Sequence, residues 1–78
     1  MLPRIENVKS NMIKVFSDSK TIMYSYDTPV VVFLLSTMQY YKTTEFFSVT
    51  TSKHINQFLD GIDKSRIVSV SQSELENL

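Results

Sequence analysis

The alternation of apolar and polar residues predicts several short β-strands, most of them in the first half of the chain. Along residues 12–17, Ile13 and Val15 fall on one face of the predicted strand. Residues 30–35 form an unbroken apolar run, which is typical of a strand that is central or buried on both faces. Strands are predicted at residues 12–17, 21–26, 30–35 and 66–70. Residues 38–43 and 45–49 are predicted to form either one further strand or two short ones.

A helix is predicted over residues 51–62. Apolar side chains recur there at i, i+3, i+4 and i+7, which places them in one stripe along the helix: Ile55, Phe58, Leu59 and Ile62. The hydroxyl side chains of residues 50–52 are candidate N-caps, because they can accept hydrogen bonds from the first free backbone N–H groups. Gly61 lies near the predicted end, where helices commonly terminate.

The whole chain of 78 residues is expected to form one domain with a single small core. Residues 1–10 are expected to form a loosely ordered arm. The capping-box spacing from Ser71 to Glu74 predicts a short C-terminal helix or tail at residues 71–78. The predicted fold class is α+β, with a four- to five-stranded, mostly antiparallel sheet and one amphipathic helix packed on one face. The helix stripe is expected to bury against Ile13, Val15, Ile22, Val31 and Phe33.

Composition and charge argue against several classes of function. The absence of cysteine excludes a disulfide framework and a thiolate metal site, and a single glycine excludes a glycine-rich phosphate loop. Eight basic residues balance eight acidic ones, so no strong electrostatic attraction to nucleic acid or an anionic membrane is expected. The longest apolar run is residues 30–35, whereas a membrane-spanning helix needs about 20 apolar residues. A cytoplasmic location is therefore expected.

His54 is the one histidine and the first candidate for proton chemistry. The sequence offers no second histidine and no cysteine to complete a metal site, so His54 is interpreted as a neutral hydrogen-bonding residue or a packing residue. Asp60 and Asp63 lie beside the polar face of the predicted helix, which favours a solvated surface over an acid–base pair. We expect no metal, no cofactor and no catalytic activity.

Aromatic residues are the least ordinary feature of the sequence. They include the adjacent pairs Tyr40–Tyr41 and Phe46–Phe47, whose members point to opposite faces if they lie on strands. Two interpretations remain open: cross-strand pairing with contact to the helix, or exposed rings that hold a partner. In the second, the candidate partner-binding residues are Tyr24, Tyr26, Tyr40, Tyr41, Lys42, Glu45, Phe47, Lys53 and His54.

One stretch resembles a pattern found in small uncharacterised bacteriophage proteins. Residues 47–59 read F-S-V-T-T-S-K-H-I-N-Q-F-L, which is similar to an aromatic-Ser-x-Thr-Thr-x-Lys-His-x-Asn motif that leads into a short helix. Residues 25–30, S-Y-D-T-P-V, resemble the Ser-Tyr-x-Thr-x-Val strand of the same proteins, and the likeness covers residues 12–60. The resemblance implies a phage product in the bacterial cytoplasm, where many such proteins block host machines, including CRISPR effectors.

Three functions are weighed on these grounds. The first is a non-catalytic, phage-encoded inhibitor of a host protein, such as an anti-CRISPR that blocks a defence nuclease complex. The second is a nucleic-acid-binding accessory protein that uses Tyr40, Tyr41 and Phe47 with Lys14, Lys42 and Lys53. The third is a small-molecule or nucleotide sponge formed at the interface of a homodimer.

Overall fold

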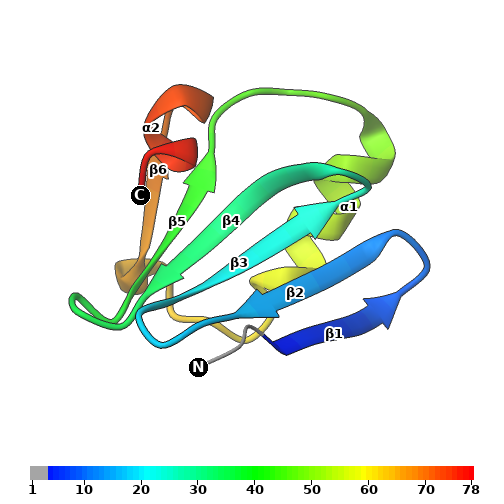
Figure 1. The fold of residues 1–78 in the computed structure, drawn as a ribbon. Helices are drawn as coiled ribbons and strands as arrows, with labels where there is room; N and C mark the ends of the chain where they lie inside the picture. Colours follow the sequence, from blue (N-terminus) through cyan, green and yellow to red (C-terminus); the bar gives the residue numbers. More distant parts are fainter. Residues whose placement is uncertain (1–3) are drawn as a thin grey trace.

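The computed structural model describes residues 4–78, which adopt an α+β fold built on one mixed sheet (Figure 1). The six strands of this sheet follow one another in chain order, from β1 at one edge to β6 at the other. Their bounds are Arg4–Lys9 (β1), Met12–Phe16 (β2), Lys20–Ser25 (β3), Thr28–Leu34 (β4), Gln39–Thr43 (β5) and Ile67–Val70 (β6). The predicted α+β class is therefore confirmed.

The sheet is mostly antiparallel, as predicted, but it has six strands where four to five were expected. The first five strands pair antiparallel, whereas β6 pairs parallel to β5. A parallel pair needs a crossover long enough to return the chain to the same end of the sheet. The helix α1 (Val49–Phe58) forms the central part of that crossover, which returns the chain from the end of β5 so that β6 can run alongside β5 in the same direction.

The predicted N-terminal arm contains a strand in the part that the structure describes. β1 pairs with β2 after a tight turn at Asn11, whose φ of 64° lies in the left-handed region that asparagine tolerates well. All of its residues are exposed, because β1 has a neighbour on one side and no helix above it. Residues 1–3 of the predicted arm lie outside the described residues.

The helix α1 begins and ends earlier than predicted. The Ser48 side chain accepts a hydrogen bond from the Thr51 backbone N–H at 3.0 Å, so the N-cap precedes the predicted hydroxyl residues. Residues 45–49, predicted as a strand, instead form the approach to this helix and its first residue. The helix stops at Phe58, and Gly61 follows with a φ of 80° in the turn that leads to the 3₁₀ turn Lys64–Arg66.

A second helix, α2 (Gln72–Glu76), follows β6 where a short C-terminal helix or tail was predicted at 71–78, in addition to the one packed helix of the predicted fold class. The predicted capping box is present: the Ser71 hydroxyl accepts from the Glu74 N–H at 3.1 Å, and a Glu74 carboxylate oxygen faces the Ser71 N–H at 3.4 Å. The Gln72 side chain donates to the Pro29 carbonyl at 2.8 Å, which ties α2 to β4. Neither helix in residues 4–78 has the length and hydropathy needed to cross a bilayer.

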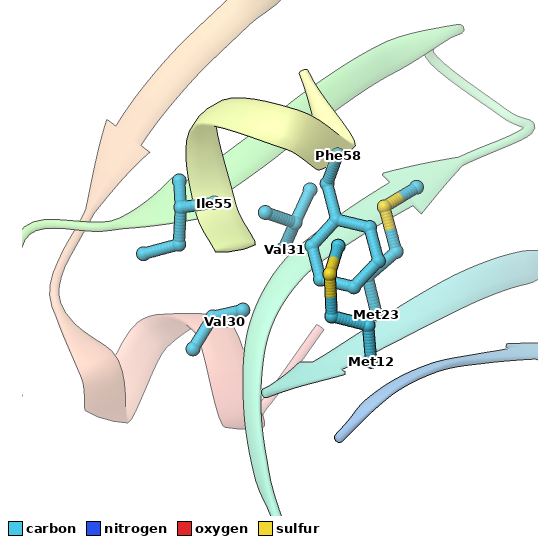
Figure 2. Packing of buried hydrophobic residues seen from close by; sticks show 6 residues of the cluster. All are labelled: Met12, Met23, Val30, Val31, Ile55 and Phe58. Atoms are coloured by element: carbon cyan, nitrogen blue, oxygen red, sulfur yellow. The ribbon is translucent and has the colours of Figure 1, made fainter. Parts of the chain in front are cut away.

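The core lies between α1 and one face of the sheet, and Figure 2 shows Phe58 pointing from α1 toward Met12 and Met23. Val31 completes the floor beneath the helix and is fully buried. The prediction that Ile13, Val15 and Ile22 form this floor was wrong, although Val31 and Phe33 were placed on the correct face. The strand register puts these three residues on the opposite face, one position out of phase with Met12 and Met23.

The opposite face of the sheet is apolar as well, which explains that error. Its register aligns one residue from each strand in a single row: Ile5, Val15, Ile22, Val32, Tyr41 and Val68. Helix α2 packs against β4 and β5, and its Leu75 is buried to 1% exposure. Both faces thus carry β-branched or aliphatic residues, so the alternation alone could not show which face the longer helix covers.

Candidate functional site

The predicted partner-binding residues fall into three regions of the fold. Tyr24 and Tyr41 lie on the sheet face that α2 partly covers, and Tyr41 bonds to Gln39 and Thr37 through its hydroxyl. Tyr40 and Lys42 lie on the face that α1 partly covers. The other predicted residues gather around the first turns of α1: Tyr26, Glu45, Phe47, Lys53 and His54.

Several strongly exposed apolar side chains lie at the start of α1, beside the predicted residues of the third region. Phe46 is 69% exposed, Phe47 is 38% exposed and Val49 is 65% exposed, all within four consecutive positions. Tyr26, at 47% exposure, lies beside the same helix because its ring contacts the ring of His54 with centroids 5.7 Å apart. We call Tyr26, Phe46, Phe47 and Val49 the α1-end surface.

Hydrogen bonds hold the loop that carries these side chains at both of its ends. The Thr44 N–H donates to the Val70 carbonyl at 2.8 Å, and the Glu45 N–H donates to the Thr43 hydroxyl at 3.1 Å. At the other end the Ser48 N-cap fixes where the helix begins. Because both ends are tied, the two phenylalanines are presented to solvent from a short, anchored segment.

A buried polar cluster fixes α1 to the sheet beneath this surface. The Ser25 hydroxyl lies 2.7 Å from Nδ1 of His54 and donates to the Thr51 hydroxyl at 3.1 Å. Ser25 has a single hydroxyl proton, so when that proton goes to Thr51 the bond to His54 is donated by Nδ1–H. His54 therefore acts as a hydrogen-bonding residue, in keeping with one of its two sequence interpretations.

The Ser25–His54 pair has the composition of a nucleophile and its base, but its setting is structural. Ser25 is 1% exposed, so its hydroxyl oxygen is closed to an external carbonyl group. No group of three potential metal ligands among His, Cys, Asp and Glu occurs within residues 4–78. The cluster's evident role is to join β3 to α1 and to satisfy polar groups inside the core.

The backbone of Tyr26 is part of the same arrangement. Its φ of 56° is in the left-handed region, which is unfavourable for a bulky residue such as tyrosine. The tight turn between β3 and β4 imposes this conformation, and the Tyr26 N–H donates to the Asn11 carbonyl at 2.8 Å. The turn thereby directs the Tyr26 ring toward His54 while leaving nearly half of it in solvent.

Polar residues border the α1-end surface. Glu45 precedes the two phenylalanines, Lys53 lies one helical turn after Val49, and both are exposed. Phe46 also lines a shallow groove of about 210 Å³ together with Lys42 and Asn56. An apolar centre with charged neighbours of both signs is the arrangement that protein–protein interfaces use.

Phe46 and Val49 were not among the predicted partner-binding residues. Residues 45–49 were predicted to form a strand, which would turn one phenylalanine inward. In the loop that forms instead, both rings are free of that alternation and both face solvent. The overlooked signal was Ser48 itself, because serine is a favoured N-cap residue and its side chain here caps the helix that begins at Val49.

Comparison with known proteins identifies a family but no characterised relative. A family of unknown function, DUF8033, matches residues 1–77 of the chain. No curated protein and no solved structure gives a match.

Proposed function

The chain belongs to the DUF8033 family, and we propose that it is a non-catalytic binding protein that docks onto a partner protein through the α1-end surface. Solvent-exposed aromatic rings on an anchored segment are the feature that supports this proposal. Such rings supply much of the binding energy in protein interfaces when they are desolvated against a partner.

The distribution of exposed apolar side chains carries the argument. Within residues 4–78, eight large hydrophobic side chains are strongly exposed, and four of them make up the α1-end surface. The others form smaller groups at β1, with Ile5 and Val8, and at the β4–β5 turn, with Leu35 and Met38. Among these strongly exposed groups of residues 4–78, the α1-end surface alone contains aromatic rings, which is why we place the interface there.

The anchoring of this surface reduces the entropy that docking must overcome. Ser25, Thr51 and His54 fix α1 to β3, and Ser48 fixes the start of the helix. Side chains held near their bound positions lose less conformational freedom on association. The buried cluster thus favours the docking role without contacting the partner itself.

The partner proposed here is a protein of a bacterial host, and a defence nuclease complex is the leading candidate. This part of the proposal rests on the resemblance of residues 47–59 to small bacteriophage proteins, a stretch that contains Phe47, Val49 and Lys53. The same reasoning places the protein in the host cytoplasm. Inhibition would follow from occupying a surface of the target, with no chemical step required.

The test compares two double variants that remove equal numbers of exposed apolar side chains. Phe46→Ser with Val49→Ser alters the α1-end surface, and Leu35→Ser with Met38→Asn alters the β4–β5 turn at the other end of β4 and serves as the control. Asparagine suits Met38, whose φ is 57°. Each tagged protein is expressed in bacteria, and the proteins that co-purify are quantified by mass spectrometry.

We expect one partner protein to co-purify with the wild type and with the control variant. The amount of that partner recovered with the α1-end variant should be at least tenfold lower. Circular dichroism should show that both variants keep the wild-type spectrum, because all four substituted side chains are exposed. Full retention of every co-purifying protein by the α1-end variant would contradict the proposal. So would a purified protein that holds no protein partner but binds oligonucleotides.

A further inference from the structure

We propose that the sheet face beside α1 is a binding site for single-stranded nucleic acid, separate from the α1-end surface. The proposal begins with the strand register. One row across this face contains three aromatic residues, and its members in strand order are Arg4, Phe16, Thr21, Phe33, Tyr40 and Ile67. We call this set the aromatic row.

The aromatic row lies at the edge of the core that α1 covers, and its three rings are only partly buried. The helix lies over the end of the sheet where β3 finishes, and the row crosses β3 at Thr21, near the opposite end (Figure 1). Phe58 and Ile55 bury Met23 and Val31, which belong to the next row along the strands. Phe33 and Tyr40 pack against the edge of this core cluster. Together with Phe16 they are only partly buried, so each of the three residues keeps some contact with solvent.

The rings form a groove with a small residue on its floor. Phe16 and Phe33 lie two strands apart, about 10 Å by the usual strand spacing, with Thr21 between them. The groove has a volume of about 240 Å³, and its other lining residues are Lys14, Met23 and Tyr40. A flat apolar ligand can therefore lie above Thr21 with an aromatic ring on either side.

The rings are held in place by their neighbours. Tyr40 and Phe33 pack against each other with centroids 4.5 Å apart, and the guanidinium carbon of Arg4 lies 4.5 Å above the Phe16 ring. Rings fixed in this way offer a surface on which bases stack without sequence preference. Arg4 adds a planar cation that can contact a base or a phosphate.

The charges on this face suit a polyanion. The next row along the strands contains Glu6, Lys14 and Lys42, so the two rows together hold three basic residues and one acidic residue. Lys14 lines the groove itself, where its ammonium group is within reach of a phosphate flanking a stacked base. Because the net charge of the chain is zero, long-range attraction to a polyanion is weak. Binding of a single strand would therefore depend on the basic residues close to the groove.

Single strands are favoured over a duplex by the chemistry of the site. Stacking on the rings requires bases whose faces are free, and in a duplex those faces are already stacked on each other. The alternative occupants are a second protein at the same groove or no ligand, in which case the rings serve as cross-strand packing pairs.

The chain supplies a closely matched control for the key ring. Tyr40 and Tyr41 are neighbours on β5, but Tyr41 belongs to the opposite face of the sheet. We therefore compare Tyr40→Leu with Tyr41→Leu, and Lys14→Gln with Lys53→Gln, which removes an exposed cation on α1. Tyr40→Phe preserves the ring and should bind as the wild type does.

The experiment measures fluorescence anisotropy of labelled oligothymidine, oligouridine and a DNA duplex with the full chain. We expect both single strands to bind more tightly than the duplex, with affinity that falls as salt rises. Tyr40→Leu should weaken binding at least about fivefold, as the loss of one stacking partner does elsewhere, while Tyr41→Leu changes it less than twofold. Lys14→Gln should flatten the salt dependence, and Lys53→Gln should leave it unchanged.

Several outcomes would overturn the proposal: no binding at low salt, salt-insensitive binding, equal affinity for the duplex, or equal effects of Tyr40→Leu and Tyr41→Leu. A thermal melt of each variant separates lost binding from lost folding, and Tyr40→Phe provides a second check if Tyr40→Leu unfolds. A result in which Tyr40→Leu abolishes capture of a protein would reassign the groove to a protein partner. None of these outcomes depends on Phe46 or Val49, so this proposal and the α1-end proposal fail separately.

Discussion

Replacing Phe58 by alanine tests the central packing contact of the fold. Phe58 is 7% exposed and packs from α1 onto Met12 and Met23 (Figure 2). Truncating a buried phenylalanine to alanine costs about 3–5 kcal/mol, because apolar contacts are lost and a cavity remains. At about 0.05–0.15 kcal/mol per residue, a chain of this length has a total free energy of unfolding of about 4–12 kcal/mol. Phe58→Ala should therefore remove between a quarter and all of the stability.

The assay is thermal and urea unfolding followed by circular dichroism and tyrosine fluorescence, since the chain has no tryptophan. For a domain of this size each kcal/mol lowers Tm by about 4–8 °C, so the expected decrease is at least about 12 °C. Val49→Ala is the control in the same helix, because Val49 is 65% exposed and its truncation should change stability by less than about 0.5 kcal/mol. A Phe58→Ala protein with the wild-type Tm would refute the placement of α1 on this face.

Two further predictions concern stability. Leu75→Ala should cost about 2–5 kcal/mol in urea unfolding, because Leu75 is 1% exposed between α2 and the sheet; an unchanged midpoint would mean that α2 does not cover this face. Ser25→Val should cost about 1–3 kcal/mol, because it leaves the buried groups of Thr51 and His54 without a partner. Adding His54→Leu should cost less than the sum of the two single variants in thermal melts, and strict additivity would show that the hydrogen bond is energetically silent.

The elements of the fold were largely predictable, because local patterns specify them. The pattern of apolar residues, including the unbroken run at 30–35, located the four central strands and β6, and the stripe from Ile55 to Ile62 located α1. The capping box at Ser71 located the start of α2. β1 was not predictable in the same way, since its residues are exposed on both faces and it forms only by pairing with β2.

The faces of the sheet were less predictable, because two helices of different length cover opposite sides. Alternation separates Tyr40 from Tyr41 but does not show which of them lies beside α1. The partners of His54 were equally hidden, because Ser25 is 29 positions away in the chain and meets it only when α1 packs on β3. The aromatic row depends on register across six strands, which no short stretch of sequence encodes.

The order of the elements along the chain has a consequence for biosynthesis. The five antiparallel strands are synthesised first, yet α1 and α2, which cover the two faces of their sheet, come after β5. Until the last third of the chain has left the ribosome, the growing polypeptide exposes Val30, Val31 and Val32 with nothing to cover them. Completion of folding must therefore wait until α2 has been synthesised, and a product truncated before α2 should aggregate rather than accumulate as a smaller stable domain.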